Sequence, residues 1–140
     1  MGAVFEFGAI TVEEAEVIAF ATRFDPQPMH TDPEAARAGP FGGLIASGWH
    51  TAALMMRLFA THLLSPPSSI ASPGIDELRW LRPVRPGDVL SLRVTVLEAH
   101  PSRSRPDRGM IRWLTEVLNQ SGEVVMSLKP MNLVRRRGDR

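Results

Sequence analysis

A carboxylate and an imidazole lie five residues apart in the segment from Asp25 to His30, and both groups can carry protons. The segment has the sequence Asp-Pro-Gln-Pro-Met-His, so two prolines separate the two groups. Prolines reduce the freedom of a loop, and an acid/base pair works only when its geometry is closely held. The residue before a proline favours extended backbone, which we expect for Asp25 and Gln27. The spacing predicts a stiff loop that presents Asp25 and His30 for proton transfer.

Residue types alone leave a structural interpretation of this pair open. A single aspartate in a loop often caps a turn, and a single histidine is often a hydrogen-bonded, partly buried residue. The sequence around the pair is therefore needed to choose between catalysis and structure.

The composition excludes several other chemistries. The chain has no cysteine, which removes disulfides, thiolate nucleophiles and cysteine-type zinc sites. His50 and His62 are twelve residues apart, whereas two helical histidines that chelate one metal are typically four apart. We expect no metal site.

Charge and hydropathy limit the partners of the 140-residue chain. Its 16 basic and 15 acidic residues give a net charge of +1, so no global field attracts nucleic acid or a membrane surface. No apolar run approaches the roughly 20 residues of a membrane span, and the acidic start is unlike a secretory signal. We expect a small substrate, no nucleic-acid or membrane partner and a cytoplasmic location.

Two helices are expected to position the pair. The first extends from Thr11 to about Phe24, because Thr-Val-Glu-Glu at residues 11–14 has the pattern of a capping box. The second extends from Gly48 to about Leu64 and has Ser47 as a natural N-cap. Arg57 is its single formal charge, so we expect this helix to be buried on most sides.

The second half of the chain has the pattern of a β-sheet. Leu90, Leu92, Val94 and Val96 alternate with polar residues, and residues 75–84, 109–118 and 123–134 are expected to form further strands. Loops are expected over residues 65–74 and 100–109, and a flexible tail over 135–140. The pattern favours an α+β fold in which an antiparallel sheet wraps around the long central helix. The sheet would leave edges uncovered, so we expect a homodimer or a dimer of dimers.

Residues 24–36 and 40–48 closely resemble the characteristic segment of MaoC-like dehydratases and R-specific enoyl-CoA hydratases. The family pattern is Asp, any residue, Asn, Pro, any residue, His, followed later by an Ile-x-His-Gly entry into the central helix. Residues 81–90 resemble the family's later Pro-Val-x-x-Gly-Asp strand entry, so the matches extend from residue 11 to about 98. The resemblance implies a single hot-dog domain over residues 1–140.

The resemblance also implies the roles of individual residues. Asp25 and His30 match the catalytic pair, which in the family acts on a 2-enoyl thioester or its 3-hydroxy counterpart. Gly48, with Ser47 before it, matches the helix start that binds the thioester oxygen, where an N–H and the positive end of the helix dipole favour an oxyanion. Gln27 supports the pair. The implied substrate is an acyl-CoA or an acyl-carrier thioester, and no cofactor is expected beyond coenzyme A as part of the substrate.

Three positions depart from the family pattern. Gln27 replaces an asparagine, Ser47 replaces a histidine, and Ala53 stands where some bacterial hydratases have a serine. Two other functions therefore stay open, namely a hot-dog acyl-CoA thioesterase and a non-catalytic acyl-thioester binding protein. The spacing of Asp25 and His30 favours the hydratase over the thioesterase, and the presence of both residues argues against a binding protein.

Other polar and aromatic residues have plainer interpretations. Trp49, Met55 and Met56 are expected in the core or in a pocket wall. A group of three arginines is expected either at solvated strand ends or on the phosphates of coenzyme A, namely Arg79, Arg82 and Arg85.

Overall fold

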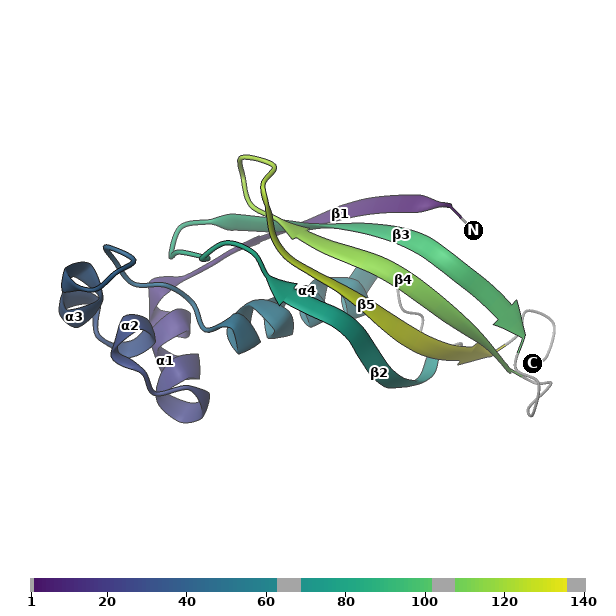
Figure 1. Cartoon of the computed structure of the whole chain (residues 1–140), viewed down its shortest axis with the longest axis horizontal. Coiled ribbons are helices and arrows are strands. Elements are labelled where there is room, and N and C mark those ends of the chain that lie inside the picture. The colour runs from purple at the N-terminus through teal and green to yellow at the C-terminus, as the bar shows by residue number, and fades with distance from the viewer. Residues whose placement is uncertain (1, 63–68, 102–107, 136–140) are drawn as a thin grey trace.

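The computed structural model describes residues 2–62, 69–101 and 108–135, which form four helices and five strands. In chain order these are β1 (Val4–Thr11), α1 (Glu14–Phe24), α2 (Pro28–Thr31), α3 (Pro33–Ala38), α4 (Gly48–His62), β2 (Ser69–Trp80), β3 (Val89–Pro101), β4 (Arg108–Leu118) and β5 (Val124–Arg135). Figure 1 shows the curved sheet lying over α4, with α1, α2 and α3 gathered at one end of the molecule.

The sheet is antiparallel throughout, with the strand order β1-β3-β4-β5-β2. In β3, Leu90, Leu92 and Val94 are buried and the residues between them are only half-buried, as a period of two requires. The predicted α+β architecture, with one antiparallel sheet packed on a long helix, is confirmed. The order leaves β1 and β2 as the edge strands.

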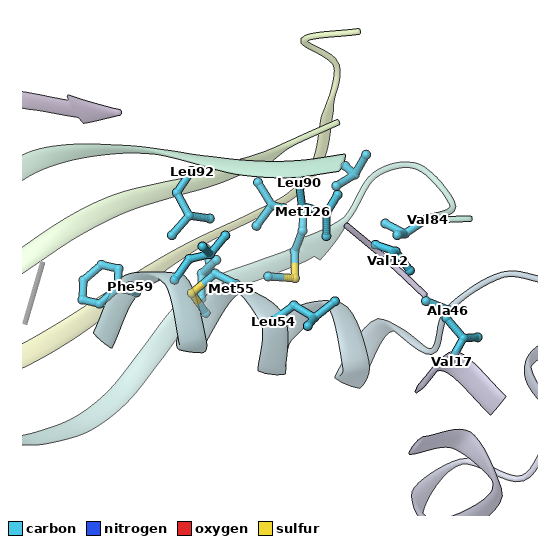
Figure 2. Close-up of a cluster of buried hydrophobic side chains, with 14 of the residues drawn as sticks. Val12, Val17, Ala46, Leu54, Met55, Phe59, Val84, Leu90, Leu92 and Met126 are labelled. Carbon is cyan, nitrogen blue, oxygen red and sulfur yellow. The ribbon is translucent and has the colours of Figure 1, made fainter. Parts of the chain in front are cut away.

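The core lies between α4 and the concave face of the sheet. Figure 2 shows Leu54, Met55 and Phe59 of α4 directed toward the sheet residues Leu92 and Met126, all of which are buried. The ring of Phe59 also meets Trp113 of β4 edge to face, with 5.5 Å between ring centroids. This packing fixes the helix against the sheet and thereby sets the position of its N-terminus.

The central helix begins at Gly48 as predicted, but it is not buried on most sides. Trp49 is 58% exposed and Met56 is 44% exposed, so one face of α4 points away from the sheet. The reason is geometric, because the sheet of a single chain covers only one face of a helix. The predicted residues 63 and 64 of this helix lie outside the described residues.

The predicted capping box at the start of the first helix is wrong. Thr11 is the last residue of β1 and pairs with Val89 of β3. The helix α1 begins at Glu14, and its N-cap Glu13 makes no side-chain capping bond. A strand pairing between residues almost eighty positions apart has overridden the local helix-start pattern.

Several strands are longer than predicted. β2 begins at Ser69, so residues 69–74 form a strand where a loop was expected, and it ends at Trp80 before the predicted end at residue 84. β3 continues to Pro101 and β4 begins at Arg108, because His100 pairs with Met110 and Pro101 with Gly109. The remaining residues of the predicted loops and tail, 65–68, 102–107 and 136–140, lie outside the described residues.

Candidate active site

Asp25 and His30 are positioned by the junction between two helices. Asp25 directly follows α1, and its N–H donates to the carbonyl of Ala21 at 2.8 Å. Pro28 is the first residue of α2, where a proline is tolerated because no intrahelical donor is needed. His30 therefore lies in a short helix and not in the predicted loop, which shrinks to residues 25–27. The extended backbone predicted for Gln27 is confirmed, whereas Asp25 has φ −154° and ψ 66°, which is not extended.

A second short helix, α3, follows immediately and was also missed. Asp32 is its N-cap, and the carboxylate of Asp32 accepts hydrogen bonds from the N–H groups of Glu34 at 3.1 Å and Ala35 at 3.3 Å. Such helices of one or two turns have too few residues for a clear apolar period, so pattern analysis does not detect them. They shorten the loops on either side of His30.

Two hydrogen bonds fasten His30 and its neighbour Met29 to the segment that leads into α4, and a third anchors that segment to the sheet side of the molecule. The Nδ1 of His30 lies 2.8 Å from the carbonyl oxygen of Ile45, whose N–H in turn donates to Met29 at 3.1 Å. Ala46 N–H donates to the carbonyl of Val84 at 2.7 Å, which ties the same segment to the β2–β3 connection. His30 is only 4% exposed. A carbonyl oxygen only accepts, so Nδ1 carries the hydrogen and Nε2 is the nitrogen free to exchange a proton.

The structure brings Asp25, His30, Ser47 and Gln27 together around one carboxylate. The Ser47 hydroxyl donates to Oδ2 of Asp25 at 2.6 Å, and the Gln27 amide donates to Oδ1 at 2.6 Å. His30 Nε2 lies 3.5 Å from the same Oδ2. Both residues that depart from the family pattern next to the pair are thus donors to the predicted catalytic aspartate.

These contacts stabilise the ionised form of Asp25. The hydrogen bond from Ser47 and then that from Gln27 lower the pKa of Asp25 below its ordinary value, with a smaller lowering from the charge of His30. Partial burial acts in the opposite direction but does not outweigh the donors. Asp25 is therefore a carboxylate near neutral pH, and its two donors favour this ionised form.

The predicted oxyanion region lies at the N-terminus of α4, next to this carboxylate. The Ser47 hydroxyl accepts from Trp49 N–H at 3.3 Å, which confirms Ser47 as the N-cap of the helix. Within the described part of the chain, the Gly48 N–H has no hydrogen-bond acceptor. A first-turn N–H of this kind is one of the orphan donors that a helix start offers to an anion.

Trp80 is a site residue that the sequence analysis missed. Its indole N–H donates to the carbonyl of Gly48 at 2.9 Å, and its ring lies directly against the glycine. The strand prediction included Trp80, but no local pattern showed that the end of β2 meets the start of α4.

The other residues considered for chemistry have structural partners. His50 is buried, lies 3.2 Å from Glu16 and stacks on Phe20. His62 contacts the ring of Phe7. Over residues 2–62, 69–101 and 108–135, no group of three His, Cys, Asp or Glu side chains is placed to hold a metal ion. Ala53 lies on the exposed face of α4.

The three arginines that were considered for coenzyme A phosphates each contact a protein group, and Arg79 donates to the carbonyl of Leu78 at 3.4 Å. Arg82 pairs with Glu123 at 3.3 Å, and Arg85 donates to the carbonyl of Phe41 at 2.6 Å. A phosphate-binding role for them stays a prediction.

Among the described helices, none is long and apolar enough to cross a membrane.

The family of the chain follows from comparison with known proteins. The model of the MaoC like domain family matches residues 1–110, and the chain belongs to this family. The crystal structure of a MaoC-like dehydratase from Rhodospirillum rubrum is 48% identical and superposes with a TM-score of 0.89, covering 97% of this chain and 92% of that chain. The predicted hot-dog fold is therefore confirmed.

Two further relatives define how far the similarity extends. The uncharacterized protein YdeM of Bacillus subtilis is 34% identical over 120 residues, which is 86% of this chain and 84% of YdeM. The 3-hydroxybutyryl-CoA dehydratase of Methylorubrum extorquens is 34% identical over 95 residues, which is 67% of this chain and 59% of the dehydratase. The aligned region thus spans about three fifths of that enzyme.

Proposed function

We propose that the protein is a hydratase or dehydratase that acts on 2-enoyl and 3-hydroxyacyl thioesters, with Asp25 and His30 as its acid/base pair. The observation that carries this proposal is the convergence of the Asp25 carboxylate and His30 Nε2, 3.5 Å apart, beside the N-terminus of α4. Membership of the MaoC-like family and the similarity to a 3-hydroxybutyryl-CoA dehydratase support the thioester substrate.

In the proposed hydration, one water molecule contacts both members of the pair. Groups 3.5 Å apart can each lie within about 2.6–3.2 Å of the same oxygen atom. The pair takes one proton from the water while its oxygen bonds to the β carbon of the enoyl thioester. The enolate that results is protonated at the α carbon, so that one whole water molecule has been added. Because both groups act from one side, the addition is syn, and the family resemblance implies the R-3-hydroxy product.

The α4 N-terminus supplies the second part of the proposed mechanism. Negative charge develops on the thioester oxygen when the enolate forms, and the Gly48 N–H together with the helix dipole favours that charge. This donor is held in place before the substrate arrives, so it costs little reorganisation during the reaction. Ser47 links the two parts, because its hydroxyl bonds Asp25 and its backbone precedes Gly48.

A panel of short and medium 2-enoyl-CoA esters tests the proposal. We expect loss of the conjugated absorbance without release of free thiol, and a product of R configuration on chiral analysis. Release of thiol without loss of conjugation would identify a thioesterase. If the wild type and Asp25→Asn both bind the esters saturably, and neither causes loss of absorbance or release of thiol, the protein is a binding protein.

A further inference from the structure

The end of β2 meets the start of α4 through one side chain, Trp80. Its Nε1 donates to the Gly48 carbonyl at 2.9 Å, although the two residues are 32 positions apart in the chain. A Cβ atom added to Gly48 would lie only 2.5 Å from Cε2 of the indole ring and 2.6 Å from Nε1. The ring of Trp49 meets Trp80 edge to face at 5.0 Å. The indole ring thus leaves no room for a side chain at position 48, which explains the glycine there.

Trp80 is not a core residue. Trp80 is 44% exposed, so its ring is far from fully buried, yet its N–H is directed at a backbone carbonyl. That carbonyl belongs to the first residue of a helix, where backbone geometry is less constrained than in the helix interior. An additional donor from the neighbouring strand restrains the peptide that follows Gly48.

We propose that Trp80 is a positioning residue that holds the first turn of α4 in its working geometry. The inference rests on the proposed function of Gly48 and Ser47. Ser47 bonds Asp25 at 2.6 Å, and Gly48 presents the N–H for the thioester oxygen. A displacement of the first turn moves both groups together, and small misplacements of reacting groups lower catalysis strongly. Trp80 acts through the backbone of Gly48 and does not itself need to touch the substrate.

A second tryptophan offers a matched control. Trp113 also donates its indole N–H at 2.9 Å, in this case to Oδ1 of Asn132. It is 6% exposed and lies in the core between β4 and α4, so its hydrogen bond has no contact with the helix start. Replacing either tryptophan with phenylalanine removes one N–H and retains an aromatic ring.

The experiment compares Trp80→Phe with Trp113→Phe in the full chain. For Trp80→Phe we expect kcat to fall by about 10-fold to 100-fold with little change in KM, as for an interaction needed mainly in the transition state. Hydrogen exchange of the amides of residues 49–51, which all donate to Ser47, should become faster in the same variant. For Trp113→Phe we expect a lower melting temperature, with kcat and the exchange of these amides unchanged.

Two results would overturn the inference. One is unchanged kcat and unchanged amide exchange in Trp80→Phe, and the other is an equal loss of kcat in Trp113→Phe. Lack of hydration by the wild type would refute the proposed function instead, and the exchange rates would still decide whether Trp80 restrains the helix start.

A double-mutant cycle tests the contact itself through stability alone. Gly48→Ala should lower the melting temperature strongly when Trp80 is present, because the new Cβ meets the ring. The same change should have little effect in a Trp80→Ala background. An equal loss in both backgrounds would show that the indole is not the reason for the glycine.

Discussion

The carboxylate of Asp25 is held by residues that differ from the usual family pattern. Gln27 and Ser47 each donate a hydrogen bond of 2.6 Å, and they contact different oxygens of the carboxylate. Each replacement therefore keeps a donor where the family often has asparagine or histidine. At the scale of single residues, the departures preserve the ionised state of the aspartate.

Removal of the Ser47 hydroxyl should shift the pH dependence of activity. The bond from Ser47 is the largest cause that lowers the pKa of Asp25, so Ser47→Ala should raise that pKa toward its ordinary value. If the reaction needs the carboxylate, the acidic limb of the kcat/KM profile moves to higher pH in the variant. Gln27→Ala should give a smaller shift in the same direction. An acidic limb that stays in place in Ser47→Ala would contradict this prediction.

The same variant has a linked effect on stability. A carboxyl whose pKa is lowered by folding stabilises the protein above its unfolded-state pKa, and this contribution is lost as pH falls through the folded-state value. Ser47→Ala should therefore lose stability at neutral pH and lose less of it in acid. A further part of the loss, about 1 kcal/mol, reflects the missing N-cap and persists at all pH values. Urea denaturation of wild type and variant at neutral and acidic pH measures both parts.

Loss of either member of the pair should impair turnover without unfolding the protein. We expect Asp25→Asn and His30→Ala each to lower kcat by roughly 10²-fold or more, the usual scale for a positioned acid or base. The double variant should cost much less than the product of the two, because the groups act as a unit. His62→Ala is the control, since His62 is exposed at the other end of α4. Full activity in either single variant would remove that residue from the mechanism.

At the scale of secondary-structure elements, α4 connects the core with the site. Its buried face packs on the sheet (Figure 2). Its N-terminus bears Ser47 and Gly48, so packing along the helix determines where the site lies. The loop with Asp25 is held to the same N-terminus by the Ser47 bond. Asp25 is thus joined to the helix that packs on the sheet.

Truncation of a buried α4 residue should destabilise the whole domain. Phe59 is 2% exposed and packs on Trp113, so Phe59→Ala should lower the free energy of unfolding by about 3–5 kcal/mol. Arg57 is exposed on the same helix, and Arg57→Ala should change that free energy by no more than about 0.5 kcal/mol. Denaturant titration of the two variants measures the difference. Similar values for both would contradict the assignment of the buried face.

At the scale of the whole molecule, the sheet has two edge strands and an exposed apolar surface near one of them. The edge strand β2 and the segment after it expose Ile75, Trp80 and Leu81, and the outer face of α4 exposes Trp49 and Met56. Exposed apolar side chains beside an unpaired edge are typical of surfaces that another chain covers.

We propose that two copies of the chain pair, as a homodimer or as a dimer of dimers. Sedimentation of the wild type at micromolar concentration should show an oligomer. Ile75→Lys should favour the monomer, because Ile75 is half exposed on the edge strand β2 and a lysine there resists pairing. Ser121→Lys, on the exposed β4–β5 turn, also adds one positive charge and is the charge-matched control. A wild type that sediments as a folded monomer would refute the proposal.

A cytoplasmic location and a single domain over residues 1–140 stay predictions.

The sequence by itself determined those features that depend on residue chemistry and near neighbours. The spacing of Asp25 and His30 made the pair a candidate, and the resemblance of the surrounding sequence to the family favoured catalysis over a structural role. Ser47 was recognised as a helix cap because capping involves only the next few peptide groups. The alternation in β3 predicted a strand, since period two depends on successive side chains alone. Resemblance to the MaoC-like family supplied the hot-dog arrangement of these elements.

Only the tertiary structure decided those features whose partners lie far away in the chain. Thr11 was predicted to cap a helix but pairs with Val89 in a strand, and residues 69–74 were predicted as a loop but pair with β5. Trp80 joins the site through Gly48, 32 residues earlier. Strand pairing and side-chain contact depend on what folding brings alongside a segment, and short-range patterns carry no information about such distant partners.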